Sequence, residues 1–199
     1  GDPDFPFCLG WANESWKAKV WDSSSVKKDR VLIEQKYPGK QDVIDHFYAL
    51  LDGFRDPRYL RIKGKPVFVV YKPFLLGDVS LFLSTWSELA NRERLSEGFH
   101  FIGHTEKSTD IPDILKLGFD AVNVVRNGEQ AFNNELLKKI VLPAIKYKFF
   151  GRPLVIDYAL ISKYFVQEVD KESNVYPTII PNWDHTPRSG SRGAVYHNS

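Results

Sequence analysis

The run Pro66-Val-Phe-Val-Val-Tyr71 is apolar throughout, and Lys65 and Lys72-Pro73 bound it on its two sides. A strand that is apolar at every position is typically buried on both faces, as strands are in a parallel sheet. Five further runs have the same character and supply the other strand candidates: Phe5 to Leu9, Phe99 to Gly103, Phe119 to Val125, Pro153 to Ile156 and Tyr176 to Ile180.

Segments with helical spacing lie between these runs. Asp110 followed by Pro112 is typical of a helix start. No Asn-Gly or Asp-Gly pair separates two alternating runs by a hairpin distance, so antiparallel hairpins are not favoured. Strands alternating with helices predict a parallel sheet. Three apolar stripes recur at steps of three and four residues: Val43, Ile44, Phe47, Leu50, Leu51 and Phe54; Phe82, Trp86 and Leu89; and Phe132, Leu136 and Ile140.

Two parallel α/β folds fit this alternation, an open doubly wound sheet and a closed (β/α) barrel. Open nucleotide-binding sheets carry Gly-x-Gly-x-x-Gly or a Gly-Lys-Ser/Thr phosphate loop, and neither motif is present. A complete barrel needs about 250 residues, whereas this chain has 199 residues and no methionine. We therefore expect one incomplete barrel domain over residues 1–199, with a mobile tail over residues 188–199.

Composition excludes several classes of protein. A hydrophobic content of 43% and a net charge of +2 do not fit disordered, coiled-coil or collagen-like chains. The Lys and Arg residues are scattered, so no nucleic-acid partner is expected. No apolar run reaches the roughly 18 residues of a membrane span, and Gly1-Asp2-Pro3-Asp4 does not resemble a signal peptide. Five dispersed histidines and the lone Cys8 offer no metal site. We expect a cytoplasmic protein without a bound cofactor.

Ligands of parallel α/β folds meet the carboxyl ends of the strands. The first apolar run leads into Gly10-Trp-Ala-Asn-Glu-Ser-Trp16, where Glu14 lies beside an amide and between two indoles. This combination suits a sugar, because the acid transfers protons, the amide bonds a hydroxyl and the rings stack on the sugar. The alternative is a loop that buries its Trp side chains in the core.

The last run leads into Pro181-Asn-Trp-Asp-His-Thr-Pro-Arg188. If the first and last segments face a common barrel mouth, Glu14 and Asp184 form a catalytic carboxylate pair roughly 5 to 10 Å apart. Alternatively, Asp184 caps the following turn and pairs with Arg188. For Tyr71 and His104 the alternatives are a core tyrosine and an exposed loop histidine. The predicted substrate-binding residues are Trp11, Asn13, Trp16, Glu34, Gln35, Tyr71, His104, Asn182, Trp183 and Arg188.

Several motifs occur in one order along nearly the whole chain: Phe5 to Glu14 with Trp16 and Trp21-Asp22, Val31 to Gln35 with Tyr37, Arg58-Tyr59, Gly64 to Tyr71, and Asn182 to Arg188. Together they resemble the WbsX family, described as glycosyltransferases of bacterial surface-polysaccharide clusters and as similar to glycoside hydrolase family 99. The resemblance implies a (β/α)8 barrel that acts on sugars. Ser15, Lys17 to Val20 and His185 depart from the family pattern.

The resemblance also implies that the chain begins near the third barrel strand and ends soon after the eighth, with Gly1 at an internal cut. We expect an enzyme of O-antigen or capsule metabolism that uses Glu14 and Asp184 on glycosidic bonds, with a nucleotide-sugar donor if the reaction is transfer. The alternative is a non-catalytic carbohydrate-binding protein or incomplete barrel. An open barrel exposes strand edges and apolar surface, so we expect aggregation or pairing with another chain.

Overall fold

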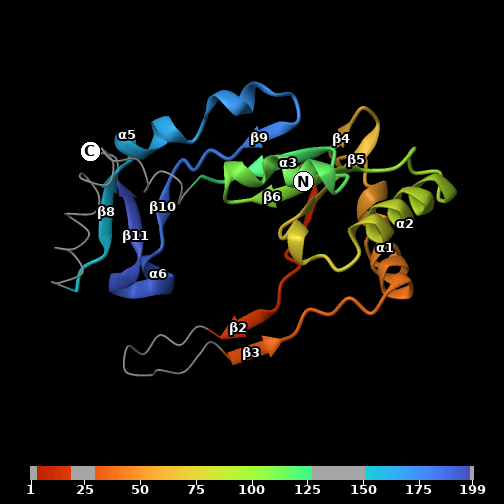
Figure 1. Cartoon of the computed structure of the whole chain (residues 1–199), viewed down its shortest axis with the longest axis horizontal. Coiled ribbons are helices and arrows are strands. Elements are labelled where there is room, and N and C mark those ends of the chain that lie inside the picture. Colours follow the sequence, from red (N-terminus) through yellow and green to blue (C-terminus); the bar gives the residue numbers. More distant parts are fainter. Residues whose placement is uncertain (1–3, 19–29, 127–150, 198–199) are drawn as a thin grey trace. The chain divides into compact units, whose positions relative to one another are not determined.

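The computed structural model describes residues 4–18, 30–126 and 151–197 of the chain. The chain forms two compact units (Figure 1). Unit 1 comprises Gly1–Thr105 and Thr109–Asn123, and unit 2 comprises Glu106–Ser108 and Val124–Ser199. The sequence predicts one domain because no linker-like stretch marks this boundary. The predicted helical stripe of Phe132, Leu136 and Ile140 lies outside the described residues.

The sheet of unit 1 confirms the parallel arrangement predicted from the apolar runs. Leu9 pairs with Phe68 and Val67 pairs with His100, both in parallel register. The Pro66 to Tyr71 run supplies the strand Lys65–Val70, which has a parallel neighbour on each side. In spatial order the strands are β1 (Leu9–Trp11), β5 (Lys65–Val70), β6 (His100–Thr105) and β7 (Ala121–Val124).

Two antiparallel pairs in unit 1 correct the prediction that such pairs are disfavoured. β4 (Arg61–Ile62) pairs with β5 through Lys63 and Gly64, whose φ angles of 51° and 80° match a tight hairpin turn. A Lys-Gly pair gives a weaker turn signal than Asn-Gly. β2 (Trp16–Ala18) pairs with β3 (Arg30–Ile33), and residues 19–29 separate the two in the sequence, so no short turn motif marks them.

Two amphipathic helices pack side by side against one face of the unit 1 sheet (Figure 1). α1 (Lys40–Arg55) buries Phe47, Leu51 and Phe54, and α2 (Val79–Arg92) buries Phe82, Trp86 and Leu89. The two predicted stripes are therefore confirmed. The short elements that follow strands β5 and β6 are η1 (Pro73–Leu75), η2 (Ser108–Asp110) and α3 (Ile111–Lys116). α3 begins directly after Asp110, as predicted.

Successive side chains of a strand point to opposite faces of the sheet. We call the face that α1 and α2 cover the helix face, and the other one the opposite face. The ring of Phe68 lies 4.6 Å from that of Trp86 in α2, so Phe68 belongs to the helix face. Gly103 belongs to it as well, since a Cβ there would clash with the side chains of Ile114 and Pro73. Tyr71 lies three positions after Phe68, and His104 lies one position after Gly103. Both are odd steps along a strand, so both side chains point to the opposite face.

Unit 2 contains a three-stranded sheet in the order β10-β11-β8. β11 (Ala194–His197) runs parallel to β8 (Leu154–Asp157) and antiparallel to β10 (Trp183–Asp184). The prediction of a tail over residues 188–199 missed β11, because its Ser- and Gly-rich flanks resemble a loop. The core of this unit consists of Ile156, Ile161, Phe165, Ile180 and Tyr196. Its other elements are α5 (Tyr158–Ile161), η4 (Ser162–Tyr164), η5 (Glu168–Lys171), β9 (Val175–Pro177), α6 (Thr186–Ser189) and η6 (Gly190–Arg192).

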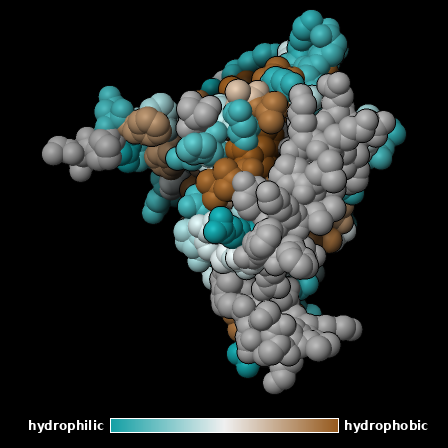
Figure 2. All heavy atoms as spheres, turned by 90° about the vertical axis from the view of Figure 1, so that its left-hand side faces the viewer, coloured by the Kyte–Doolittle hydropathy of each residue, from teal (hydrophilic) through white to brown (hydrophobic). Residues whose placement is uncertain are grey.

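Large apolar side chains reach the surface in both units. Figure 2 shows such side chains as brown areas among hydrophilic ones on the face that it displays. Within the described ranges, no helix has both the length and the apolar character needed to cross a membrane. The most exposed apolar side chains are Phe5 (74%), Ile179 (64%), Trp16 (63%) and Ile33 (62%).

Tyr59 links β1 to β5, and its titration should appear in the stability of the fold. Its hydroxyl donates to the Val67 carbonyl at 2.7 Å and accepts from the Leu9 N–H at 3.1 Å. Burial raises the pKa of Tyr59 to about 12 from the ordinary value of 10.0. The neutral phenol therefore stabilises the fold fully below pH 10, and this contribution is lost as pH rises from 10 to 12.

We expect this loss to reach about 2 to 3 kcal/mol, from roughly 1.4 kcal/mol per pKa unit. Urea denaturation at several alkaline pH values measures it, with Tyr59→Phe as the comparison. The variant should lose less stability over this range than the wild type. Equal losses in the two proteins would show that Tyr59 does not titrate in this way.

Candidate functional site

The carboxyl ends of β5, β6 and β7 bring three polar side chains together on the opposite face of the sheet. The rings of Tyr71 and His104 are stacked, with centroids 4.6 Å apart and an interplanar angle of 15°. Nδ1 of His104 lies 2.7 Å from Oδ1 of Asn123. We call Tyr71, His104 and Asn123 the polar row. The row stands where parallel α/β folds bind ligands.

His104 is the residue of the polar row best suited to chemistry. It is 9% exposed, so it is a buried strand residue and not the exposed loop histidine that the sequence left open. An amide oxygen only accepts, so Nδ1–H donates to Asn123 and Nε2 carries the lone pair of the neutral ring. No group in the described part of the chain bonds to Nε2. This nitrogen can therefore accept a proton or hydrogen bond from a ligand hydroxyl.

Asn123 is a site residue that the sequence reasoning missed. It lies inside the predicted strand from Phe119 to Val125, where every other position except Asp120 is apolar or small. A single amide within such a run was the available signal. Asn123 orients the His104 ring through this hydrogen bond. The sequence reasoning looked for site residues after the ends of strands, whereas Asn123 lies within one.

Asn13 is fully buried and holds the loop that carries Glu14. Its Nδ2 donates to the Lys72 carbonyl at 2.9 Å and to the Tyr37 hydroxyl at 3.1 Å, and its Oδ1 accepts from the Lys72 N–H at 2.7 Å. Tyr37 in turn donates to the Asn13 carbonyl at 2.8 Å. The side chain thus fastens the end of β1 to the residues after β5. Its predicted contact with substrate stays a prediction.

Glu14 is exposed on this fastened loop. No residue of the described ranges bonds to its carboxylate, which is therefore open to solvent and to a ligand. Nearby, Ser15 accepts from the Gln35 N–H at 3.0 Å, and Trp16 pairs with Ile33 across β2 and β3. Glu34, which the sequence also predicts to bind substrate, forms an exposed ion pair of 3.3 Å with Lys36.

Trp11 faces the helices and not the polar row. Its ring lies 4.6 Å from that of His46, 5.6 Å from Phe82 and 5.9 Å from Tyr37. The structure therefore separates Trp11 from Tyr71 and His104, which the sequence grouped with it as ligand-binding residues.

The remaining predicted site residues belong to unit 2. Asp184 is exposed, and its Oδ1 accepts from the Thr186 N–H at 2.8 Å and from the Thr186 hydroxyl at 2.6 Å. These bonds lower the pKa of Asp184 and match the turn-capping role left open by the sequence. Trp183 stacks on His185 at 5.7 Å, while Asn182 and Arg188 are exposed. Because Glu14 belongs to unit 1, its pairing with Asp184 stays a prediction.

A buried ion pair in unit 2 was not anticipated. The side chains of Arg126 and Asp170 are 0% and 2% exposed, and two bonds of 2.6 and 2.7 Å join the guanidinium to the carboxylate. Arg126 also donates to the Phe165 carbonyl at 2.8 Å and to Ser108 Oγ at 2.9 Å. With this many internal partners, the pair acts as a structural anchor of unit 2.

No cluster of three or more His, Cys, Asp or Glu side chains suited to a metal ion occurs among residues 4–18, 30–126 and 151–197. The side chains of the polar row and of Glu14 carry groups that exchange protons and form hydrogen bonds with hydroxyls. Such an arrangement fits a ligand rich in hydroxyl groups.

Comparison with known proteins agrees with the resemblance seen in the sequence. The uncharacterized protein WxcX of Xanthomonas campestris pv. campestris is 29% identical over 195 residues, in two strains. The alignment covers 96% of this chain and 26% of WxcX, so the chain spans about a quarter of that relative.

A solved structure, the GH99 endo-alpha-mannosidase from Bacteroides thetaiotaomicron, is 21% identical with a TM-score of 0.40. That alignment covers 78% of this chain and 41% of the mannosidase. The family described as "Glycosyltransferase WbsX" matches residues 1–199, the full length of the sequence. The chain therefore belongs to the WbsX glycosyltransferase family.

Proposed function

We propose that this chain is part of a carbohydrate-active enzyme that acts on glycosidic bonds. The observation that carries the proposal is the polar row at the carboxyl ends of β5, β6 and β7, together with the exposed Glu14 on the loop that Asn13 fastens to Lys72, the residue after Tyr71. Family membership supports a sugar substrate. The bacterial surface-polysaccharide role and the cytoplasmic location expected from the sequence are parts of the same proposal.

The proposed architecture is a (β/α)8 barrel to which this chain contributes roughly the third to eighth strands. In such a barrel the face away from the helices is the interior, and its carboxyl end is the active-site mouth. The parallel pairing of β1, β5 and β6, with helices on the other face, supports this arrangement. Tyr71 and His104 would then line the mouth.

In this mechanism Glu14 transfers a proton to or from the glycosidic oxygen, or stabilises the positive charge of the transition state. Asp184 is its proposed carboxylate partner. His104 accepts a hydrogen bond from a sugar hydroxyl through Nε2, because Asn123 occupies Nδ1. Further proposed substrate contacts come from Trp16, Glu34, Gln35, Asn182, Trp183 and Arg188.

A second candidate function is carbohydrate binding without catalysis. One observation favours it: the Asp184 carboxylate is engaged by Thr186. In that case the aromatic residues bind a glycan and the Asp184 carboxylate is structural.

A substrate screen distinguishes these functions. The purified protein is incubated with bacterial polysaccharides, with and without nucleotide-sugars, and the products are followed by mass spectrometry. Release of sugars without an activated donor indicates hydrolysis, and donor-dependent extension indicates transfer. Glycan binding without any product supports the second function and contradicts the first.

A further inference from the structure

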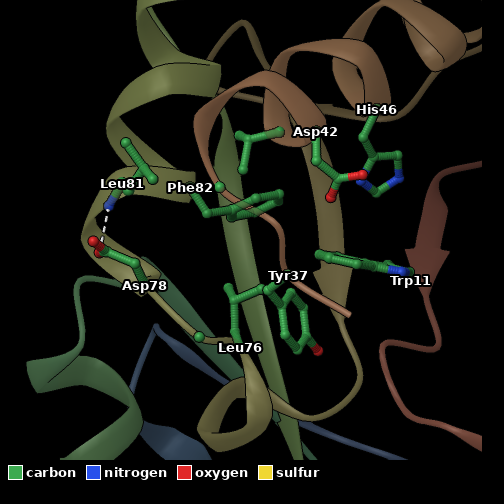
Figure 3. A pocket seen from close by; sticks show the side chains of 11 residues that line it. Trp11, Tyr37, Asp42, His46, Leu76, Asp78, Leu81 and Phe82 are labelled. Carbon is green, nitrogen blue, oxygen red and sulfur yellow. Dashed lines mark hydrogen bonds between the residues drawn. The ribbon is translucent and has the colours of Figure 1, made fainter. Parts of the chain in front are cut away.

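A pocket of about 250 Å³ lies on the helix face of the unit 1 sheet, where α1 and α2 begin (Figure 3). It is separate from the polar row, because Trp11 in its wall and Tyr71 in the row belong to opposite faces of the sheet. Its lining residues are Trp11, Tyr37, Gly39, Asp42, Val43, His46, Leu76, Gly77, Asp78, Leu81 and Phe82.

Aromatic rings make up much of the wall. Figure 3 shows Trp11, Tyr37 and Phe82 around a common space. The Trp11 and Phe82 rings are tilted by 36°, and the Trp11 and Tyr37 rings by 69°, so their surfaces do not stack on one another. Trp11 and Tyr37 are partly exposed, so part of each ring is open to the apolar face of a ligand, whereas Phe82 is buried and backs the wall.

The polar groups of the pocket disfavour anions. Asp42 and Asp78 supply two carboxylates, and neither Lys nor Arg is among the described residues that line it. Asp78 accepts from the Leu81 N–H at 2.9 Å, as the dashed line in Figure 3 marks. Burial lowers the pKa of His46, so its ring does not supply a positive charge at neutral pH. A phosphate or nucleotide diphosphate would therefore lack a cationic partner.

We propose that this pocket binds a single neutral sugar ring of a carbohydrate, at a site additional to the polar row. The inference rests on the proposed function, which makes carbohydrate the ligand class. A pyranose has hydroxyl groups, which donate hydrogen bonds to carboxylates, and C–H groups, which contact aromatic surfaces. The pocket offers both kinds of partner. The volume lies just below the usual 300 to 1,000 Å³ of small-molecule pockets, which suits one ring and not an oligosaccharide.

Tyr37 joins this pocket to the proposed active-site loop. Its ring lines the pocket, and its hydroxyl bonds Asn13, which precedes Glu14. A sugar ring bound here would sit against the residue that helps to hold that loop.

Titration of ¹⁵N-labelled protein with methyl glycosides of glucose, galactose, mannose and rhamnose tests the inference. The readout is the indole N–H resonance of Trp11, assigned with Trp11→Phe, and uridine diphosphate is the anionic probe. We expect at least one glycoside to shift this resonance saturably and uridine diphosphate to leave it unchanged. The inference is overturned if no glycoside shifts it, or if the diphosphate does.

Variants locate the binding. Leu81→Trp fills the pocket and should abolish the saturable shift, while Asp42→Asn should weaken the affinity about tenfold by removing a charged acceptor. Asp45→Asn, exposed on the same helix, is the matched control and should bind normally. Unchanged affinity in both pocket variants contradicts the inference. If Leu81→Trp does not fold, Asp42→Asn decides.

The proposed function fails separately from the inference. Binding at Trp11 with no turnover of any glycan would retain this site and reject the enzymatic role. Turnover that requires His104, with no glycoside effect at Trp11, would reject this site and retain the enzymatic role.

Discussion

Replacing Asp170 by alanine should lower the free energy of unfolding by about 3 to 5 kcal/mol, the usual cost of removing one member of a buried ion pair. Arg126 is fully buried, and in this variant its guanidinium would retain only neutral acceptors among the partners described above. The charge cannot be relieved by deprotonation, since arginine stays protonated in proteins. Chemical denaturation followed by circular dichroism measures the change.

Glu168→Ala is the matched control for this prediction. Glu168 forms an ion pair of 2.7 Å with Lys171 in the same segment, but both side chains are more than 70% exposed. Exposed pairs contribute about 0 to 1 kcal/mol. A joint replacement, Arg126→Met with Asp170→Leu, should recover most of the stability, because no charge is then left buried. The anchor is refuted if Asp170→Ala costs no more than Glu168→Ala.

Replacing Glu14 by glutamine should reduce turnover of a glycan substrate about 100- to 10,000-fold, the usual contribution of one general acid or base. Glutamine keeps the size of the side chain but cannot transfer a proton. Glu14 is exposed, and no described residue bonds to its carboxylate, so the variant should fold like the wild type. Steady-state kinetics and a thermal melt measure the two quantities together.

Glu88→Gln serves as the control, because Glu88 is an exposed carboxylate on α2, away from the proposed site. Its turnover should equal that of the wild type. If Glu14→Gln keeps full turnover, Glu14 has no part in proton transfer and another carboxylate must be sought. A loss shared by both variants would point to an effect of net charge.

The parts of the fold that sequence reasoning predicted depend on local pattern. The strand ending at Tyr71 is apolar at successive positions because it is central in its sheet, and the stripe from Phe47 to Phe54 follows the turn of one helix. The apolar run and the helical stripe each span only a few consecutive residues, and over such a length the spacing of apolar residues directly reflects which side chains are buried. The same reasoning predicted that Tyr71, His104 and Glu14 lie at or after the ends of strands, as they do, and their contact with a substrate stays a prediction.

The missed features depend on partners far apart in the chain. Arg126 and Asp170 are separated by 44 residues, and neither stands in a motif. Strand β11 finds its neighbours only once β8 and β10 are in place. The side-chain bonds of Asn13 with Lys72, across 59 residues, are likewise long-range contacts, and they give Asn13 a structural role that the sequence did not indicate. Local sequence pattern carries no record of such contacts.

The central claim is that the polar row forms part of a carbohydrate-active site, and the turnover of His104→Gln tests it most directly. The assay uses a glycan substrate of the wild-type protein and determines kcat and KM for both. Glutamine can still fill the strand position, but its flexible amide does not place an acceptor where the imidazole Nε2 lies. The account predicts turnover by the wild type and a loss of about tenfold in kcat/KM in the variant, the usual loss for one hydrogen bond to the substrate. Full turnover by His104→Gln, or a wild type that turns over no glycan, would contradict it.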